Sequence, residues 1–439
     1  MFFHFTTFFF DEDYVKLNFI HQGKEKEFFF LFCLKKYYFT NSQSTIKSCI
    51  NYSNSGNNMK HINKKDAINK AKFDILIVGA GISGAVLAER FASRCNKKVL
   101  IIDKREHIGG NCYDFIDQNG ILINKYGAHI FHTNYKKVWE YIHKFSEWER
   151  WDHRVLGFIE GKYINIPVNI NTVNALCGTN IKDENEMNRW LKSNQVKYNK
   201  LNNSEETAKS RVGEELYNKI FRNYTYKQWN KYPEELDYPV LSRIPVRKNF
   251  DDRYFDDKYQ VLPKYGYTKF IENILKHPNI YVLTNTDYFE FKNTINFDNL
   301  IYTGPIDKYF EESGFHKLEY RSIEFIEERY KNMNFYQVNS VINYPEINVL
   351  YTRIVEYKHF LNQQSPHTTI VKEFPKDSGE PYYPVPDKKN LILLKKYKKL
   401  SEHEKHVRFI GRLANYKYIN MDQAIKNSLE FFNNYNHCK

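Results

Sequence analysis

The feature that most constrains this 439-residue chain is a glycine pattern that directly follows a short apolar run. Residues 73–78 read FDILIV, which is typical of a strand buried inside a parallel sheet. Gly79, Gly81 and Gly84 follow with the spacing G-x-G-x-x-G, and an apolar helical pattern continues from there. In this context the pattern predicts a strand–helix unit whose helix N-terminus binds the pyrophosphate of a dinucleotide.

Each glycine of the pattern has a steric reason, and an acidic residue follows at the expected distance. Gly79 permits the tight turn, Gly81 lets the backbone approach the pyrophosphate, and Gly84 allows the helix to pack on the strand. A second apolar run, residues 99–102, ends at Asp103, whose carboxylate can accept the ribose hydroxyls and repels a 2′-phosphate. The expected cofactor contacts here are Gly79, Gly81, Ser83, Gly84 and Asp103.

The glycine pattern is shared by NAD and FAD sites, so the two cofactors have to be distinguished by the flanking segments. Residues 104–111, KREHIGGN, resemble the basic, double-glycine extension of FAD-binding members of this fold. The late apolar run 407–410 and the following Gly411 and Arg412 resemble a flavin-closing motif, in which a second helix N-terminus faces the ring system. We therefore predict FAD as the cofactor. Further expected contacts are Lys104, Gly110, Asn111 and Arg412.

The remaining patterns predict an α/β fold, a Rossmann-type FAD-binding domain with an inserted helical lobe and an antiparallel β-sheet lobe. We expect residues 1–70 to form a poorly ordered N-terminal extension, because their composition is rich in Asn, Ser and Lys. The parts of the FAD-binding domain are expected at residues 71–165, 251–310 and 386–439. A mostly helical substrate lobe with a mobile loop is expected at residues 166–250, and the β-sheet substrate lobe at residues 311–385.

Composition argues against several classes of function. The net charge of +13 is spread among interspersed acids without a nucleic-acid motif, so it favours attraction of an anionic substrate over nucleic-acid binding. The six cysteines contain no C-x-x-C pair, which argues against a metal site and favours reduced thiols in a cytoplasmic protein. No apolar run reaches the roughly 18 residues of a membrane span, and the acidic start disfavours a signal peptide.

Beyond the cofactor motifs, the chain resembles one family in particular. Residues 126–133, YGAHIFHT, are similar to a signature of bacterial-type UDP-galactopyranose mutase. Further segments agree with that family in the same order, from about residue 73 to residue 432. They are IPVN at 166–169, YTYKQW at 224–229, RIPVR at 243–247, YTR at 351–353, PYYP at 381–384 and YKY at 416–418.

The resemblance implies an isomerase that interconverts UDP-galactopyranose and UDP-galactofuranose for galactofuranose-containing cell wall or glycan. It implies that N5 of reduced FAD attacks the anomeric carbon while UDP leaves, so the protein itself supplies no nucleophile. It also implies an external reductant such as NAD(P)H, and it leaves a homodimer open.

The resemblance implies catalytic roles for Arg243, Arg353 and His129. An arginine suits the departing diphosphate because its fork donates charge-assisted hydrogen bonds to phosphate oxygens and keeps its charge. His129 is expected beside the flavin, where an imidazole that changes charge near neutral pH could balance the anionic reduced ring.

The family match also implies the remaining contacts. Substrate contacts are expected from Asn169, Phe221, Tyr224, Thr225, Trp229, Arg243, Tyr254, Arg321, Asn343, Arg353, Tyr383 and Tyr418. Further flavin contacts are expected from His129, Ile130, Tyr418, Asn420 and Met421. Asn420 stands where the family usually has Asp, and Asn223 and Asn230 stand where glycine is usual, so we expect slower turnover.

Two other functions fit the cofactor motifs alone. One is an FAD-dependent oxidoreductase of the amine-oxidase-like group, which has no reason to keep paired arginines for a diphosphate. The other is a non-catalytic nucleotide-sugar-binding flavoprotein.

Overall fold

The computed structural model describes residues 5–11, 14–21, 24–30, 59–69, 72–242 and 244–435. The chain divides into two compact units, Met1–Gly56 and Asn57–Lys439. In the first unit, where no regular element was expected, three strands form an antiparallel sheet in the order β1-β2-β3. The strands are β1 (Phe5–Asp11), β2 (Tyr14–His21) and β3 (Lys24–Phe30).

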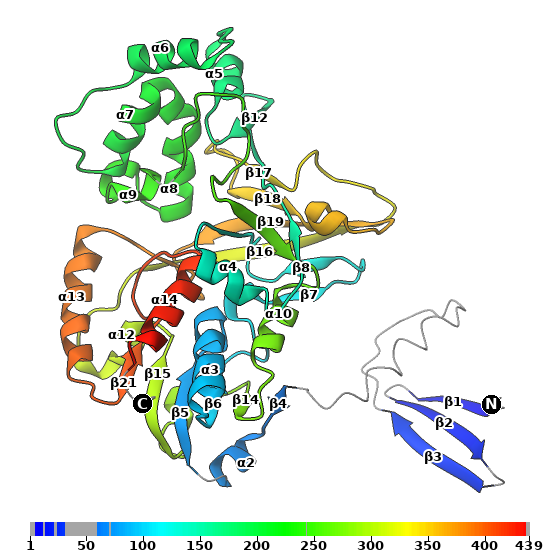
Figure 1. The fold of residues 1–439 in the computed structure, drawn as a ribbon. Helices are drawn as coiled ribbons and strands as arrows, with labels where there is room; N and C mark the ends of the chain where they lie inside the picture. The colour runs from blue at the N-terminus through cyan, green and yellow to red at the C-terminus, as the bar shows by residue number, and fades with distance from the viewer. Residues whose placement is uncertain are drawn as a thin grey trace. The chain divides into compact units, whose positions relative to one another are not determined.

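The second unit is built on a six-stranded parallel sheet, in the lower part of Figure 1. Its order is β21-β15-β5-β6-β14-β4, and every neighbouring pair is parallel. The strands are β4 (Lys60–His61), β5 (Phe73–Val78), β6 (Val99–Ile102), β14 (Ile280–Leu283), β15 (Phe297–Tyr302) and β21 (Val407–Phe409). The strand–helix–strand unit predicted from the glycine pattern is confirmed, because β5 continues through α3 (Ile82–Cys95) into β6.

Helices cover both faces of this sheet, which explains why its central strands are apolar on both sides. Ile75 and Ile77 of β5 pack with α3, α10 (Tyr267–Ile274) and α14 (Met421–Asn433), whereas Leu76 faces the opposite cluster. The other helices of this region are α2 (Lys64–Asn69), α4 (Lys136–Ile142), α11 (Tyr288–Phe291), α12 (Ile306–Tyr309) and α13 (Lys388–Glu402).

The parallel sheet begins earlier in the chain than expected. Strand β4 pairs with β14, with Lys60 opposite Tyr281, and the Ile62 N–H donates to the Val282 carbonyl at 2.9 Å. Ala67 of α2 is buried. Residues 60–69 therefore belong to the sheet and not to the extension that was expected up to residue 70. The physical reason is that the outer edge of β14 carries backbone groups that a further strand can pair.

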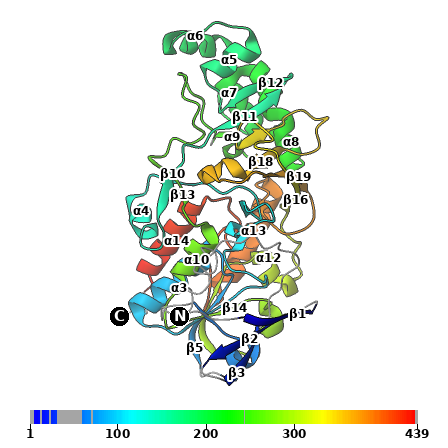
Figure 2. The same ribbon diagram turned by 90° about the vertical axis from the view of Figure 1, so that its right-hand side faces the viewer.

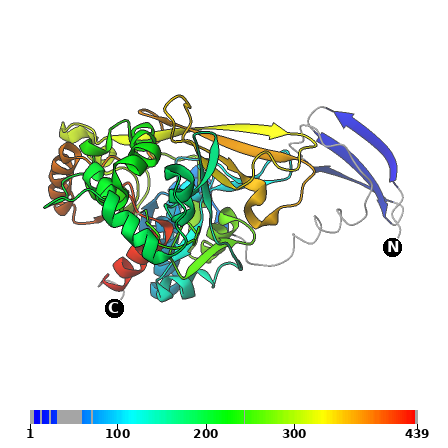
Figure 3. The same ribbon diagram turned by 90° about the horizontal axis from the view of Figure 1, so that it is seen from above.

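A seven-stranded sheet forms the β lobe, with the order β12-β11-β17-β18-β19-β16-β20. Its strands are β11 (Val155–Ile159), β12 (Lys162–Ile166), β16 (Tyr320–Tyr330), β17 (Val341–Asn343), β18 (Arg353–Glu356), β19 (Thr368–Lys376) and β20 (Tyr383–Pro384). Figure 3 shows the long strands β16 and β19, which pair antiparallel along their length.

Two expectations about this lobe need correction. The β11–β12 hairpin was assigned to the FAD-binding part, but it joins the β lobe through a parallel pairing of Leu156 with Ile342. The sheet is therefore mixed and not purely antiparallel. Alternating burial along β11 explains the pairing, because one face of this strand has an apolar surface to cover.

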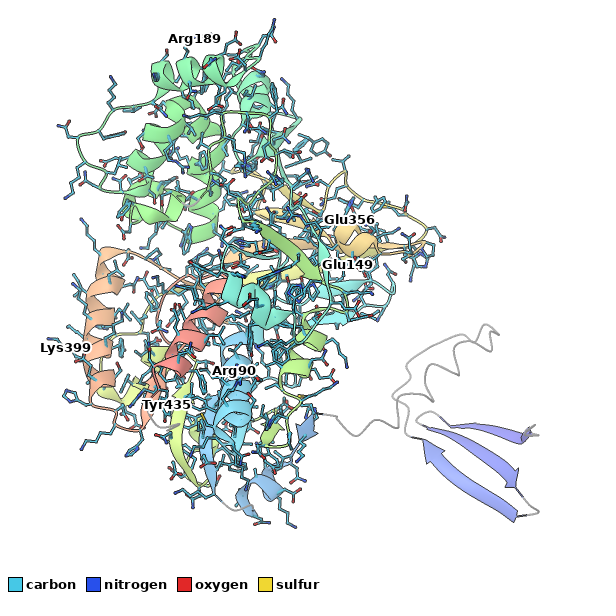
Figure 4. The ribbon with its side chains drawn as sticks, viewed as in Figure 1. Arg90, Glu149, Arg189, Glu356, Lys399 and Tyr435 are labelled. Atoms are coloured by element: carbon cyan, nitrogen blue, oxygen red, sulfur yellow. The ribbon has the colours of Figure 1, made fainter. Side chains whose placement is uncertain are left out.

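Helices of the inserted lobe, at the top of Figure 2, pack against the β lobe through a shared apolar core. They are α5 (Ile170–Cys177), α6 (Glu184–Asn194), α7 (Ser204–Leu216), a π-helical turn (Tyr217–Arg222), α8 (Asn223–Trp229) and α9 (Pro239–Ser242). Figure 4 marks Arg189 on α6 and Glu356 at the end of β18, on these two separate lobes. Glu356 is fully buried and accepts the N–H groups of Tyr336 and Gln337 at 2.8 and 2.9 Å.

Small elements connect the lobes. Strands β9 (Phe131–Thr133), β10 (Trp148–Arg150) and β13 (Tyr259–Pro263) form one antiparallel sheet, and β7 (Asp114–Ile116) pairs with β8 (Leu122–Asn124). Short 3₁₀ turns lie at Gly110–Cys112, Pro233–Glu235, Glu311–Ser313 and Tyr357–Asn362.

Within the described ranges, none of the helices has the length and apolar character that a membrane span requires. Cys112 and Cys177 are free thiols, whereas Cys95 is disulfide-bonded, which differs from the expectation of reduced thiols throughout.

Candidate active site

A first cavity of about 610 Å³ lies at the carboxyl ends of β5 and β6 and at the N-terminus of α3. This is the position where open parallel sheets bind their ligands. Twelve residues expected to contact the cofactor line it. They are Gly79, Gly81, Ser83, Gly84, Asp103, Lys104, Gly110, Asn111, His129, Arg412, Asn420 and Met421.

Three glycines of this cavity leave no room for a side chain. A Cβ on Gly79, where φ is +104°, would lie 2.0 Å from Thr303 Oγ1, and one on Gly84 would lie 2.0 Å from the Gly79 carbonyl oxygen. A Cβ on Gly110 would lie 2.8 Å from the Gly81 Cα. The resulting cradle of bare backbone at a helix N-terminus fits a dinucleotide pyrophosphate.

Asp103 is buried at the end of β6 and stabilises the turn above the helix. Its Oδ2 accepts the Ala80 N–H at 2.8 Å, and its Oδ1 accepts the Arg105 N–H at 2.9 Å. Each carboxylate oxygen has a second lone pair, so Asp103 can still accept a ribose hydroxyl in the cavity it lines.

A second cavity of about 450 Å³ lies between the helical lobe and the β lobe. Nine expected substrate residues line it, including Tyr418, which was also expected to contact the flavin, and so does the expected flavin contact Ile130. The nine are Phe221, Tyr224, Thr225, Trp229, Tyr254, Asn343, Arg353, Tyr383 and Tyr418. Burial raises the pKa of Tyr224 and of Tyr383, so both hydroxyls stay protonated and can donate to an anion.

The two cavities adjoin each other, because five residues line both of them. They are Asn111, His129, Arg412, Asn420 and Met421. Arg412 is held in place by two hydrogen bonds to the Ile419 carbonyl, at 2.6 and 3.2 Å. The Asn420 N–H donates to Gln423 Oε1 at 3.1 Å, so Asn420 lies at the N-terminus of α14. A ligand bound in one cavity would therefore lie next to a ligand bound in the other at these residues.

Arg353 of β18 is a half-buried cation of the second cavity. Its Nε donates to Glu373 Oε2 at 2.6 Å, and the two residues are register partners on β18 and β19. Burial lowers the pKa of Arg353, but Glu373, Tyr224 and Tyr383 together outweigh this and raise the pKa above its usual value. Gly127 leaves space for this pair, since a Cβ there would lie 3.2 Å from Glu373 Oε1 and 3.5 Å from Arg353 Nη2.

His129 lies where the two cavities meet. Burial, reinforced by Arg412 and Arg353, lowers its pKa to about 4. The imidazole is therefore neutral at pH 7 in the cofactor-free chain, and its expected change of charge beside a reduced flavin stays a prediction. Its Nδ1 lies 2.7 Å from the Gly127 carbonyl, which can only accept, so Nδ1 carries the proton and Nε2 is an acceptor.

Two of the expected substrate residues do not line the second cavity. Asn169 is fully buried and caps α5, accepting the Thr172 N–H at 3.0 Å. Arg321 is buried beneath α8, where its Nε donates to the Gln228 carbonyl at 3.0 Å. Arg243 lies outside the described residues, so its role stays a prediction.

Sequence reasoning missed several residues of the two cavities. Glu373 and His153 line the second cavity, and burial followed by Arg353 lowers the pKa of His153 to about 3. At the first cavity Glu380 forms ion pairs with Lys104 at 2.7 Å and with Arg105 at 3.3 Å. None of the three stands in a local motif, and only the strand register could have indicated Glu373. Among the described residues, no group of three His, Cys, Asp or Glu side chains could hold a metal.

A dinucleotide cradle on a parallel sheet, with a second cavity that opens beside it, defines a Rossmann-type flavin-dependent enzyme. Comparisons with known proteins make this assignment specific. A sequence profile described as UDP-galactopyranose mutase matches residues 219–418, and one described as NAD(P)-binding Rossmann-like domain matches residues 77–145.

Curated relatives cover nearly the whole second unit. A probable UDP-galactopyranose mutase of Klebsiella pneumoniae is 36% identical over 362 residues, covering 81% of this chain and 93% of the relative. A dTDP-fucopyranose mutase of Escherichia coli is 36% identical over 366 residues, covering 81% of this chain and 96% of the relative. A crystal structure of reduced UDP-galactopyranose mutase superposes with a TM-score of 0.65 at 17% identity, over 83% of this chain and 94% of that one.

The chain belongs to the UDP-galactopyranose mutase family. It is therefore an isomerase, and FAD is the cofactor of its family.

Proposed function

We propose that this enzyme interconverts UDP-galactopyranose and UDP-galactofuranose, with FAD in the first cavity and the nucleotide sugar in the second. The observation that carries the proposal is the junction of the two cavities at His129, Arg412 and Asn420, which brings a flavin and a sugar within reach of each other. Bound FAD in its reduced form supplies the nucleophile for the anomeric carbon.

The residues of the second cavity suit a departing diphosphate. Arg353 stays charged and is aimed by Glu373, so it is organised to bind phosphate oxygens before the sugar–phosphate bond breaks. The protonated hydroxyls of Tyr224 and Tyr383 add neutral donors. Arg243 is proposed as the second arginine on the diphosphate, which matches the family motif RIPVR.

His129 has a different part in the proposal. Because its Nδ1–H donates to the Gly127 carbonyl, its Nε2 can accept a proton or a hydrogen bond at the place where the cavities meet. A negative charge bound next to it would raise its pKa from about 4. His129 is therefore proposed to become cationic only when the reduced cofactor is bound.

A second candidate substrate is the dTDP-fucose pair, because the relative named dTDP-fucopyranose mutase shares the same 36% identity as the Klebsiella protein. The two substrates differ in a methyl group on the base, in a ribose hydroxyl and at C6 of the sugar. The proposal favours UDP-galactose because the matched profile and most of the named relatives are UDP-galactopyranose mutases.

One assay tests both candidates. The FAD-loaded protein is reduced with dithionite and given UDP-galactofuranose or dTDP-fucofuranose, and the pyranose product is separated by chromatography. We expect conversion of the UDP sugar, and no conversion by the oxidised enzyme. Faster conversion of the dTDP sugar would favour the dTDP-fucose pair as the substrate. Conversion of neither sugar would refute both candidates.

The same proposal includes an external reductant such as NAD(P)H, a cytoplasmic location and an assembly that is a monomer or a homodimer. Bleaching of the flavin absorbance by NADH or NADPH without air would support the reductant.

A further inference from the structure

Lys227 lies on α8, the helix whose Tyr224, Thr225 and Trp229 line the second cavity. Its side chain does not line the cavity and instead extends into the loop between β17 and β18. The three N–H groups of its Nζ face four backbone carbonyls of this loop, those of Glu346 at 3.0 Å, Val349 at 2.8 Å, Tyr351 at 3.0 Å and Tyr344, so one N–H is shared between two of them. One ammonium thus occupies a cage of carbonyl oxygens that all belong to residues 344–351.

The loop 344–351 that surrounds the ammonium has residues of the second cavity at both of its ends. Strands β17 and β18 are antiparallel, and their last register pair before the loop is Asn343 opposite Arg353. The Tyr344 N–H closes the loop by donating to the Thr352 carbonyl at 2.8 Å. Asn343 and Arg353 both line the second cavity. The hydrogen bonds of Lys227 therefore connect one wall of this cavity to the opposite one.

The charge of Lys227 is balanced mainly by backbone dipoles. Among the described residues it forms no ion pair, and the carboxylate acting on it is that of Glu346. Burial lowers the pKa of Lys227 to about 8, and Glu346 opposes this shift. A buried cation loses hydration free energy, and hydrogen bonds have to replace it. The contacts of Nζ with the loop carbonyls supply these hydrogen bonds.

The C-terminal end of α8 is held separately by the β lobe. Arg321 of β16 donates to the Gln228 carbonyl at 3.0 Å and to the Lys227 carbonyl at 3.3 Å. Asp377 pairs with Arg321 and accepts the Asn230 amide at 3.0 and 3.1 Å. Arg321 thus anchors the helix to the sheet, while Lys227 alone reaches the loop.

We propose that Lys227 is a positioning residue for nucleotide binding, which holds the α8 wall and the Asn343–Arg353 wall at the separation that the nucleotide needs. The inference rests on the proposed function of the second cavity. Without Lys227 the loop carbonyls turn to water and the two walls separate, so the nucleotide has to restore their spacing when it binds. This cost falls on binding and largely spares the bound complex.

The test uses the FAD-loaded full chain with Lys227→Met, which keeps the length of the side chain and removes its donors. Lys162→Met is the matched control, because Lys162 is an exposed lysine on β12 of the same sheet. UDP is titrated by calorimetry, and KM and kcat are measured with the nucleotide sugar. We expect the Kd for UDP and the KM to rise about tenfold or more, and kcat to fall less than about threefold.

The control is expected to stay within about a factor of two of the wild type in Kd, KM and kcat. A Kd for UDP that is unchanged in Lys227→Met overturns the inference and leaves the proposed function standing. A wild-type enzyme that binds neither UDP nor dTDP overturns both. If Lys227→Met does not fold, Lys227→Gln, which keeps two N–H donors, has to show an intermediate loss of UDP affinity, and an unchanged Kd there is equally decisive against the inference.

Discussion

The two cavities of this enzyme are built in different ways. The first is formed mainly by backbone, from glycines at positions where even a Cβ does not fit. The second is formed by side chains from several distant segments, and its central cation depends on a buried partner. Ligand binding in the first cavity should therefore be lost when an added side chain obstructs the backbone. The function of the second cavity should be lost when a charge is removed or a side chain is misaligned.

The largest effect is expected from Gly84→Ala. The added Cβ would lie 2.0 Å from the Gly79 carbonyl oxygen and 3.2 Å from Ile77 Cγ2, so α3 has to move away from the strand. We expect the FAD content of the purified protein, measured by flavin absorbance, to fall more than about tenfold. Gly178→Ala is the control for a general loss of stability, because Ala is strained at its φ of +64° although a Cβ there meets nothing within 4 Å. Full FAD content in Gly84→Ala would show that the cradle is not set by this glycine.

Next in size is Arg353→Ala, which removes the half-buried cation that pairs with Glu373 in the second cavity. We expect kcat to fall about 10³-fold while FAD stays bound, because the departing diphosphate loses its aligned donor. Glu373 is left as a buried carboxylate without its partner, which should lower the free energy of unfolding by about 3–5 kcal/mol.

The double variant Arg353→Ala/Glu373→Gln separates the two effects. Urea unfolding should show that it regains most of the stability, and the mutase assay should show that it stays inactive. Activity within about tenfold of the wild type in Arg353→Ala would contradict the role given to this residue.

A smaller effect concerns pH. In the FAD-free chain the folded pKa of His129 is about 4, below the unfolded value of about 6.5. The unfolded chain therefore binds the additional proton, and stability falls as the pH drops from about 6.5 towards 4. Between pH 7 and pH 5 we expect this histidine to account for about 2 kcal/mol of lost unfolding free energy.

Urea unfolding of the FAD-free protein at pH 7 and pH 5 measures this effect. His129→Asn should show a smaller acid loss than the wild type, and a remaining loss from His153, whose pKa of about 3 acts in the same direction. His143→Asn, at an exposed histidine, should behave as the wild type. An equal acid loss in His129→Asn and in the wild type would exclude a buried neutral imidazole.

The smallest effect tests a residue that the family match assigns to the substrate and the structure assigns to a helix end. Asn169→Ala removes the side chain that accepts the Thr172 N–H, which should cost about 1 kcal/mol of stability. The Kd for UDP should stay within about a factor of two, and Asn169→Asp should restore the cap. A large loss of UDP affinity at unchanged stability would instead support a substrate contact by Asn169.

The contrast between the cavities also explains how much could be predicted from the sequence. The strand–helix–strand unit and the contacts from Gly79 to Asp103 follow from one contiguous pattern, because local backbone shape decides them. The ion pair of Arg353 with Glu373 depends on the register of β18 and β19, which no local pattern encodes.

The neutral state of His129 could not be predicted for a related reason. It depends on burial and on Arg412, which lies far along the chain. The β11–β12 hairpin was assigned to the wrong lobe because its parallel neighbour, β17, comes much later in the sequence. Family resemblance supplied the aromatic residues of the second cavity, but it could not tell a ligand from a helix cap at Asn169.

With FAD in the first cavity and the nucleotide in the second, as proposed, the five residues common to both cavities would make the binding of one ligand depend on the binding of the other. Whatever factor FAD gains in affinity when UDP is bound, UDP must gain when FAD is bound, since the two routes to the ternary complex have equal free energy. A side chain such as Met421 that is ordered by the first ligand no longer has to be ordered by the second. The flavin would then act as an effector of nucleotide affinity as well as a reactant.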